Sequence, residues 1–273
     1  MYVFFKGLVD IHLYSPLQRG DTCLKMVESR IIVEKLVKKY EDITAVDGLS
    51  LRVEEGELFG LLGPNGAGKT TTISILCGLL KPTGGSATVC GYDVQKESIK
   101  IRRLIGVCIQ ETAVYPYLTG EENVRFFGDL YAMDKGTLES RCTILFEKMG
   151  LVSDANRRVG KYSGGMKRRL SLILALIHDP KVVFLDEPTV GMDPQSRRAV
   201  WDFIRELKRE GKTIILTTHY MEEAEELCDR AGIIDHGRLI ALGPPEDLIQ
   251  RGGVRNLEEL FIKLTGRRIR EEA

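Results

Sequence analysis

The segment GPNGAGKTTT at residues 63–72 constrains the fold of this chain more than any other feature. It follows an apolar run of strand length (residues 57–62) and precedes an apolar stretch of helical length (71–80), so the local order is strand, glycine-rich loop, helix. Such glycines turn main-chain N–H groups inward, and the helix N-terminus adds positive partial charge. Lys69 is placed to reach the outer phosphates, and Thr70 is placed to ligate Mg²⁺. The complete G-x-x-x-x-G-K-[ST] spacing therefore predicts a nucleoside triphosphate site, against the simpler alternative of a glycine turn that happens to carry a lysine.

Composition narrows the class of protein. The 273 residues suffice for one large domain or two small ones, and 39 basic residues balance 39 acidic ones, so no global attraction to nucleic acid or anionic lipid is expected. The six cysteines include no C-x-x-C pair, which favours a reducing cytosol and no structural zinc. No apolar run approaches the roughly 18 residues of a membrane span, which predicts a chain that is soluble by itself.

Both ends of the chain are expected to lie outside the nucleotide-binding domain. Residues 1–29 have short apolar runs broken by charges, without the ordered pattern of a signal peptide, so we interpret them as an extension with Met26 as a candidate natural start. The regular pattern spans residues 30–245. Residues 246–273 form a helical tail, in which 256–264 fits an amphipathic helix that packs as a terminal cap.

Strand patterns dominate the chain before residue 111. Alternating residues at 31–38 and 49–53 predict strands of a sheet beside the nucleotide. Tyr40 ends the first of them, where its ring either stacks on a base or is an ordinary surface tyrosine. A buried strand is predicted at 105–109 and ends at Gln110, whose amide is well placed to contact a metal ion.

From residue 111 to about 172, helical spacing replaces the strand pattern, which we interpret as an inserted helical subdomain. Near its end Ser163, Gly164 and Gly165 open an apolar helix at about 166–177. A serine with two glycines at a helix N-terminus exposes main-chain N–H groups at the positive end of the helix dipole, as a second anion site would. An ordinary helix N-cap is the commoner explanation of such a triplet.

Residues 181–187 predict a buried strand that ends in Asp186 and Glu187. In a nucleotide site the first carboxylate would hold the Mg²⁺ shell, and the second would polarise the attacking water. Without the glycine loop, two acids before a proline would more simply begin a turn. The next buried strand, 212–218, is followed by His219, which is either a structural residue or one that reaches the terminal phosphate.

The order of these motifs resembles the ATP-binding subunit of an ABC transporter. The matching features run from Ile31 to about Thr265 and are the glycine loop, Gln110, SGGM with its basic helix, FLDE, MD and His219. YSGGM, GMDPQSRR and NLEELFIKLTGR are similar to the exporter branch that includes daunorubicin-resistance-type and related lipid or polysaccharide efflux ATPases. The resemblance implies an α/β fold, namely a P-loop NTPase (RecA-like) core with an antiparallel β subdomain and an inserted α-helical subdomain.

The resemblance also implies the cofactors, ATP and Mg²⁺, and the residues that hold them. Tyr40 would stack on adenine. The Mg²⁺ set would be Thr70, Gln110 and Asp186. The phosphates would be held by Gly63, Pro64, Asn65, Gly66, Ala67, Gly68, Lys69, Thr70 and Thr71.

For catalysis, the resemblance implies that Glu187 is the general base, that His219 contacts the γ-phosphate, and that Lys69 is a third catalytic residue. Two subunits would pack head to tail, so that the Ser-Gly-Gly triplet (residues 163–165) of one closes over ATP bound by the other, with Asp193 at the interface. Hydrolysis would reopen this dimer.

The implied partners are a separate transmembrane permease and a second ATPase subunit, either a copy or a paralogue. No nucleic acid is expected, and the chain would be peripheral on the cytoplasmic face of the membrane, docked on the permease near residues 111–122. Three classes remain open: an exporter ATPase, an importer ATPase, and a soluble ABC ATPase acting on nucleic acid or ribosomes. The single cassette and the short segment after Pro245 favour the exporter. Tyr162 and Met166 depart from the common LSGGQ signature, so Met166 is assigned no polar contact with nucleotide.

Overall fold

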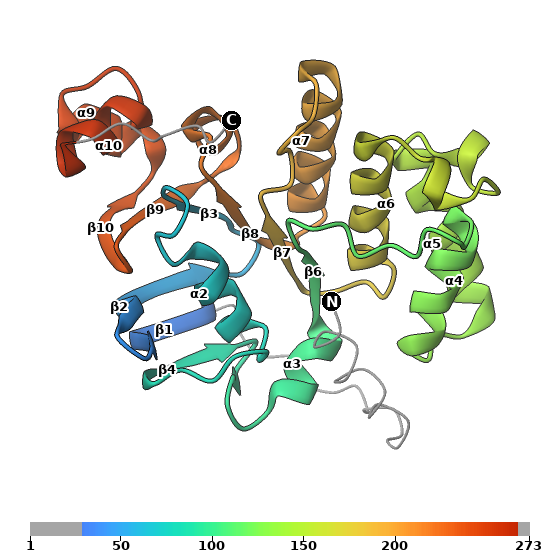
Figure 1. Ribbon diagram of the computed structural model, residues 1–273, viewed down its shortest axis with the longest axis horizontal. Coiled ribbons are helices and arrows are strands. Elements are labelled where there is room, and N and C mark those ends of the chain that lie inside the picture. The colour runs from blue at the N-terminus through green and yellow to red at the C-terminus, as the bar shows by residue number, and fades with distance from the viewer. Residues whose placement is uncertain (1–28, 267–273) are drawn as a thin grey trace.

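Two β-sheets organise the computed structural model, which describes residues 29–266 (Figure 1). The first sheet is antiparallel, with the strand order β2-β1-β4-β5. Its strands are β1 (Ser29–Tyr40), β2 (Ile43–Glu54), β4 (Gly84–Val89) and β5 (Tyr92–Asp93). The second sheet has the order β10-β9-β3-β8-β7-β6, in which all strands are parallel except β10. Its strands are β3 (Leu58–Leu62), β6 (Ile105–Cys108), β7 (Val182–Asp186), β8 (Thr213–Thr218), β9 (Arg230–Asp235) and β10 (Arg238–Gly243).

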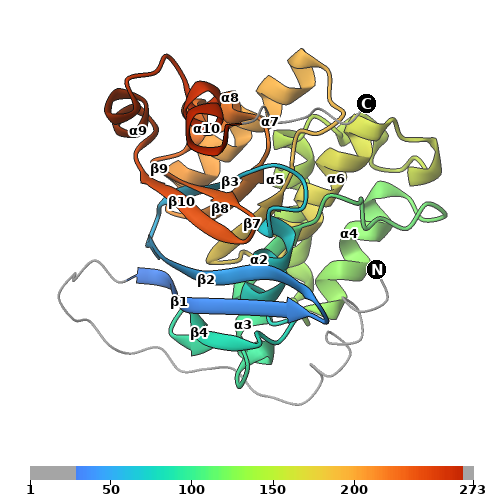
Figure 2. The same ribbon diagram turned by 60° about the vertical axis from the view of Figure 1, so that its left-hand side comes forward.

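Helices cover both sheets and form a separate group at one side. In Figure 1, α4 to α6 lie together away from the antiparallel sheet, and Figure 2 shows α7 to α10 on the far side of the parallel strands from β1, β2 and β4. The helices are α2 (Lys69–Leu76), α3 (Ser98–Leu104), α4 (Gly120–Leu130), α5 (Lys135–Lys148), α6 (Gly164–Leu176), α7 (Pro194–Arg209), α8 (Met221–Leu227), α9 (Pro245–Gly252) and α10 (Leu257–Thr265), with short 3₁₀ turns at Val152–Asp154 and Val159–Lys161.

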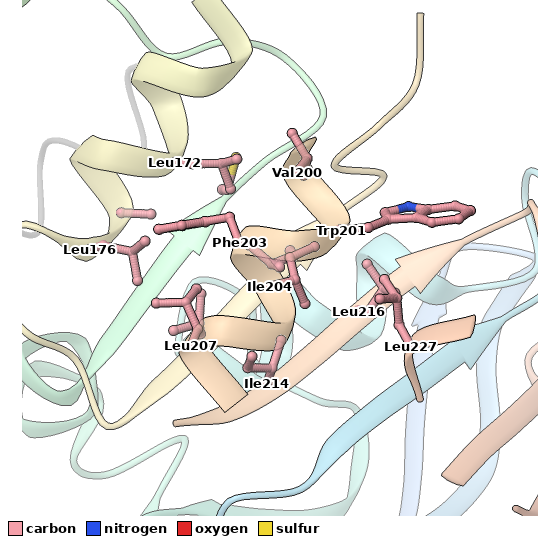
Figure 3. Close-up of a cluster of buried hydrophobic side chains, with 14 of the residues drawn as sticks. Leu172, Leu176, Val200, Trp201, Phe203, Ile204, Leu207, Ile214, Leu216 and Leu227 are labelled. Carbon is pink, nitrogen blue, oxygen red and sulfur yellow. The ribbon is translucent and has the colours of Figure 1, made fainter. Parts of the chain in front are cut away.

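The parallel sheet is buried on both faces. Side chains alternate along each strand, so each strand contributes to two hydrophobic clusters, one on either face. In β7, Val183 and Leu185 pack in the cluster that contains α6, α7 and α8. Val182 and Phe184 point the other way, into the cluster shared with α2 and the antiparallel sheet. Figure 3 shows the first cluster, where α6, α7 and β8 bring together Leu172, Leu176, Val200, Trp201, Phe203, Ile204, Leu207, Ile214 and Leu216. The carboxyl ends of the parallel strands are therefore held on a rigid support.

The observed elements confirm the predicted α/β fold with an antiparallel sheet, a parallel sheet and a helical region. Several predicted boundaries were wrong. The strand expected at 49–53 already begins at Ile43, because it pairs with β1 through the turn after Tyr40. The helix expected from about Met166 to Ile177 spans Gly164–Leu176, because Ser163 caps it and leaves both glycines inside the first turn.

The predicted helical segment at 111–172 contains α4 and α5, but its first nine residues are not helical and α6 continues beyond its end. The predicted extension at 1–29 lies outside the described residues except for Ser29, as do Met26 and the end of the tail at 267–273. The described part of the tail forms α9 and α10, and Leu257, Leu260 and Phe261 are buried in the larger cluster, as expected of a terminal cap.

Candidate functional site

The glycine loop joins the end of β3 to the start of α2, and two of its glycines are required by close approaches. A Cβ on Gly63 (φ +155°) would lie 2.3 Å from the carbonyl oxygen of Ile234, and one on Gly68 (φ +103°) would lie 2.3 Å from that of Ala45. Gly68 is also the N-cap of α2, and no side chain caps this helix or adds an acid to its first turn. The N-terminal N–H groups of α2 are therefore left for an anion.

A cavity of about 260 Å³ lies over this loop. It brings most of the predicted phosphate-binding residues together with the polar end of β6 and the carboxylate that follows β7. Its lining residues are Ala45, Pro64, Asn65, Gly66, Ala67, Gly68, Lys69, Thr70, Thr71, Gln110 and Glu187. Gly63 is absent from the lining, but its carbonyl oxygen accepts a hydrogen bond from Lys69 Nζ at 2.7 Å.

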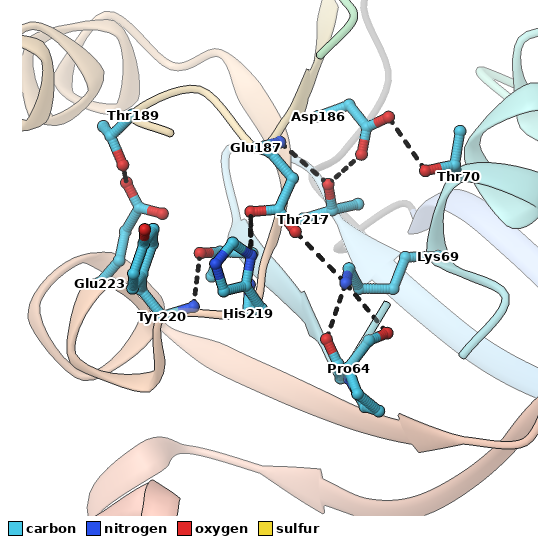
Figure 4. Close-up of polar contacts among 12 residues, drawn as sticks. Pro64, Lys69, Thr70, Asp186, Glu187, Thr189, Thr217, His219, Tyr220 and Glu223 are labelled. Atoms are coloured by element: carbon cyan, nitrogen blue, oxygen red, sulfur yellow. Dashed lines mark hydrogen bonds and ion pairs between the residues drawn. The ribbon is translucent and has the colours of Figure 1, made fainter. Parts of the chain in front are cut away.

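Lys69 is the cation of the cavity, and its side chain is 6 % exposed. Its Nζ also donates to the carbonyl oxygen of Pro64 at 3.3 Å and lies 3.2 Å from Glu187 Oε1 (Figure 4). These contacts hold the ammonium group between the loop and the carboxylate. A phosphate that enters the cavity therefore meets a positioned, largely desolvated cation.

Asp186 and Thr70 meet at the edge of the cavity. Asp186 ends β7, and its Oδ2 accepts a hydrogen bond from Thr70 Oγ1 at 3.1 Å. Its Oδ1 accepts one from the hydroxyl of Thr217, which lies beside it in the parallel register of β7 and β8. Carboxylate and hydroxyl oxygens with a nearby amide are the hard ligands that Mg²⁺ prefers, and Gln110 lines the same cavity. The donor set fits a magnesium ion.

Glu187 has an unusual backbone. Its φ is +50°, in the left-handed region, which costs a residue other than glycine about 1 to 3 kcal/mol and is typical of functional sites. Its N–H donates to the carbonyl oxygen of Thr217 at 3.0 Å and to the Thr217 hydroxyl at 3.2 Å. This conformation turns the side chain toward Lys69 and His219 instead of along the strand direction (Figure 4).

The Glu187 carboxylate is buried and paired with two basic side chains. His219 Nδ1 lies 2.9 Å from Oε2, and the His219 N–H is 3.4 Å from the same oxygen. Burial by itself would raise the pKa of Glu187, but the hydrogen bond from His219 and the charge of Lys69 outweigh it and hold the pKa below its usual value. Glu187 is therefore ionised near neutral pH, as a proton acceptor must be.

The Ser-Gly-Gly triplet lies on a different element from the cavity, and none of its residues is in the cavity lining. Ser163 is an exposed N-cap of α6 whose hydroxyl accepts from the N–H of Met166 at 3.2 Å, so the simple capping interpretation holds within one chain. A Cβ added to Gly164 would meet nothing within 4 Å, and one on Gly165 would be 3.9 Å from Ser196 Oγ. Nothing within residues 29–266 explains why Gly164 is a glycine.

Asp186 and His219 contact lining residues but are not part of the cavity lining, and His219 lines a separate pocket. Asp193 and Tyr40 also lie outside the lining. Asp193 is the exposed N-cap of α7 and accepts from the N–H groups of Gln195 and Ser196 at 3.0 and 2.9 Å. The ring of Tyr40 is at the end of β1, 43 % exposed, with Lys38 Nζ 4.8 Å from its centroid. Their predicted roles toward a partner subunit and toward adenine stay predictions.

Three residues were missed by reasoning from the sequence. Thr217 donates to the carboxylate of Asp186 and accepts from the main-chain N–H of Glu187, as described above. Arg168 is buried in α6 and donates only to main-chain carbonyl groups. Glu223 is buried in α8, and its Oε1 accepts from Thr189 Oγ1 at 2.8 Å (Figure 4). The same oxygen accepts from Trp201 Nε1, also at 2.8 Å. Burial raises the pKa of Glu223. The only local signal for Thr217 was a polar residue inside a buried strand.

A phosphate-binding loop after β3, a carboxylate pair at the end of the parallel strand β7 in the same sheet, and a buried lysine between them define a P-loop nucleotide hydrolase. The family model described as ABC transporter matches residues 46–190. The chain belongs to the ABC transporter family, in which it is an ATP-binding and ATP-hydrolysing subunit.

Similar proteins support this assignment over most of the chain. The linearmycin resistance ATP-binding protein LnrL of Bacillus subtilis is 45 % identical, covering 84 % of this chain and 74 % of its own length. The daunorubicin resistance ATP-binding protein DrrA3 of Streptomyces coeruleorubidus is 44 % identical (84 % and 73 %). The Nod factor export ATP-binding protein I of Cupriavidus pinatubonensis is 46 % identical (80 % and 67 %).

Among solved structures, a dimeric ATP-binding cassette in a post-hydrolysis state, bound to ADP and Pi, superposes with a TM-score of 0.72. It is 27 % identical, and the match covers 78 % of this chain and 98 % of that one. The predicted similarity to resistance-type ABC ATPases is confirmed.

Proposed function

We propose that this chain powers the export of a small molecule through a separate membrane permease, and that it does so as a head-to-tail dimer. The observation that carries the dimer is the split between a completed phosphate cavity and an open Ser-Gly-Gly triplet in the same chain. The dimeric cassette among similar structures supports this arrangement. Relatives named for drug resistance and Nod factor export favour an exporter over an importer.

In the proposed complex, Lys69 and the loop N–H groups hold the phosphates of ATP, and the triplet of the second subunit closes over them. Thr70, Asp186 and Gln110 hold Mg²⁺, which supplies charge stabilisation to the transferred phosphoryl group. The exposed ring of Tyr40 stacks on adenine.

Glu187 acts as the general base of the proposed reaction. Its ionised carboxylate accepts the proton of the attacking water, while His219 holds its Oε2 and reaches the γ-phosphate side. Lys69 Nζ lies 3.2 Å from Glu187 Oε1. The arrival of phosphate draws the ammonium group away, which frees that oxygen for water. Catalysis thus depends on positioning and electrostatics, with no covalent enzyme intermediate.

Asp193 is proposed to contact the second subunit across the dimer interface, next to the triplet. Residues 30–245 are assigned to the ATPase domain and residues 246–273 to the helical tail. Within residues 29–266 every helix is too short or too polar to cross a membrane. The proposed association with the cytoplasmic face of the membrane runs through the permease, and ABC family membership supports it.

Affinity purification of the tagged chain from detergent-solubilised native membranes tests this function. We expect a multi-span membrane protein to co-purify, and the ATPase activity of that complex to respond to the permease substrate. The complex carrying Glu187→Gln should form but not hydrolyse ATP. Recovery with ribosomes or DNA, with no membrane protein, would assign the chain to the soluble class instead.

A further inference from the structure

Arg168 is a buried arginine whose five N–H donors are all used by main-chain carbonyl oxygens. It is 5 % exposed and lies in the second turn of α6. Its Nε donates to Pro188 at 2.9 Å, its Nη2 donates to Asp186 and Glu187, each at 2.6 Å, and its Nη1 donates to Gln110 at 3.0 Å and to Ile109. A guanidinium group has a rigid fork of donors, so these contacts fix the relative positions of its acceptors.

The acceptors belong to the two segments that carry the proposed metal and base residues. Ile109 and Gln110 follow β6, and residues 186–188 form the end of β7 and the chain just beyond it. These segments are more than seventy positions apart in the sequence, and the pairing of β6 with β7 ends at Cys108 and Leu185, just before both of them. Arg168 therefore holds Gln110 and Glu187 at a set spacing where the sheet no longer does.

The contact with Glu187 matters most, because that residue is in the left-handed region at φ +50°. Thr217 holds its N–H from one side, and Arg168 Nη2 holds its carbonyl group from the other. Both peptide groups that flank the strained torsion angles are thereby fixed. The direction of the carboxylate toward Lys69 and His219 depends on these two restraints.

Arg168 is also rigidly linked to the Ser-Gly-Gly triplet. Ser163 caps α6, and Arg168 follows five positions later, about 8 Å along the helix axis. A shift or rotation of α6 that accompanies docking of the triplet moves the guanidinium group with it. The first turn of this helix would face the ATP of the partner, whereas the second turn holds the hydrolytic groups of its own chain.

We propose that Arg168 is a positioning residue that couples the triplet to Gln110 and Glu187 of the same chain, so that docking on one ATP sets the base at the other site. This rests on the proposed head-to-tail dimer. Arg168 contacts neither nucleotide nor water. It acts through the main chain of the two segments, and its loss lowers turnover while ATP still binds.

The neighbouring Arg169 provides a matched control. It is on the same helix and also donates to a main-chain carbonyl, but its partner is Met149 at 2.8 Å, at the end of α5 in the helical region. Arg168→Lys and Arg169→Lys keep the charge and the helix propensity, and each removes the fork of donors. Melting temperature, ATP affinity and steady-state ATPase kinetics are measured for both variants and the wild type.

For Arg168→Lys we expect kcat to fall about tenfold to a hundredfold, as for other residues that orient a reacting group, with KM and ATP affinity within about twofold of wild type. Arg169→Lys should keep the wild-type kcat. Equal kcat in the two variants would overturn the proposal. A loss of ATP affinity that matches the loss of kcat would also overturn it. So would an Arg168→Lys protein that does not fold while Arg169→Lys does, because either result would give Arg168 a purely structural role.

A second measurement uses Arg168→Ala with added guanidinium ion at millimolar concentration, and sodium chloride at equal ionic strength as the control. Recovery of kcat by guanidinium alone supports a role for the donors, and recovery by both salts or by neither contradicts it. The wild-type protein separates this inference from the proposed function. If the wild type does not hydrolyse ATP, the proposed function fails. If the wild type is active and the two lysine variants have equal kcat, only the role of Arg168 is refuted.

Discussion

The phosphate loop and the Ser-Gly-Gly triplet are both glycine-containing helix N-termini, but only the first is complete within the chain. Gly63 and Gly68 are required by backbone oxygens 2.3 Å from a hypothetical Cβ, and Lys69, Thr70 and Glu187 surround the cavity in front of them. Gly164 faces open space. The same local geometry is thus packed against its own chain in one case and left exposed in the other.

This difference supports the proposal that a second subunit supplies the other half of the site. A glycine that the fold itself does not require leaves room for something outside the described chain, and the positive end of a helix dipole suits an anion. In the proposed dimer, the exposed triplet of one subunit and the buried loop of the other are complementary parts of one ATP site. Four experiments test the comparison, in order of expected effect.

Glu187→Gln changes the proposed general base beside the phosphate loop, and it should have the largest effect on ATP hydrolysis. The amide cannot accept the proton of water, so we expect ATP hydrolysis to fall by about a hundredfold or more while ATP still binds. An ATP-bound dimer should then accumulate on size-exclusion chromatography. Glu222→Gln, at an exposed position of α8, is the control and should behave as wild type. Full turnover by Glu187→Gln would show that Glu187 is not the general base.

Lys69→Ala removes the cation between the loop and Glu187. A charged hydrogen bond to phosphate contributes about 2 kcal/mol, so ATP affinity measured by calorimetry should fall roughly thirtyfold. The pKa of Glu187 should rise toward its usual value, because the charge of Lys69 helps to lower it. Unchanged ATP binding would count against this loop as the phosphate site.

Gly68→Ala and Gly164→Ala test the two halves directly. At Gly68 the new methyl group would meet the Ala45 carbonyl oxygen in a left-handed backbone, so the free energy of unfolding should fall by about 2 kcal/mol. At Gly164 the free energy of unfolding should change by less than about 0.5 kcal/mol. ATP hydrolysis should nevertheless drop about tenfold, because the methyl group obstructs the dimer interface. Normal hydrolysis by Gly164→Ala would contradict the placement of the triplet at the dimer interface.

The smallest expected effect is a pH dependence of stability, and it concerns the anchored end of α6, opposite the exposed triplet. Just beyond α6, His178 stacks on Tyr131 with ring centroids 3.7 Å apart, and its Nε2 lies 3.0 Å from the carbonyl oxygen of Ile105. Burial lowers the pKa of His178 to about 4 from 6.5, so its contribution to stability is present above the unfolded pKa and declines as pH falls.

Denaturant titrations should show the wild type losing about 1 kcal/mol from this histidine between roughly pH 7 and pH 5.5. His178→Gln lacks the titrating group and should have a shallower pH dependence, although it is less stable at neutral pH. An identical pH dependence in the two proteins would show that His178 is not held neutral by the fold.

Residues close together in the sequence were predictable because short-range geometry defines them. The spacing of the glycine loop fixes its turn and helix N-terminus, and the carboxylate pair after an apolar run fixes a strand end. Ser163 was recognised as a cap for the same reason. The ABC resemblance rested on the order of these local motifs, and the comparisons confirm it.

The tertiary structure alone decided the contacts between segments. Thr217 reaches Asp186 only because β7 and β8 are parallel neighbours in one register. Arg168 looked like one of several basic residues on a helix, and packing of α6 against the ends of β6 and β7 buried it among carbonyl groups. Local propensity cannot encode such contacts, because each depends on which strands and helices become neighbours. The sequence by itself determined that a phosphate would bind, and the packing determined how Glu187 is held beside it.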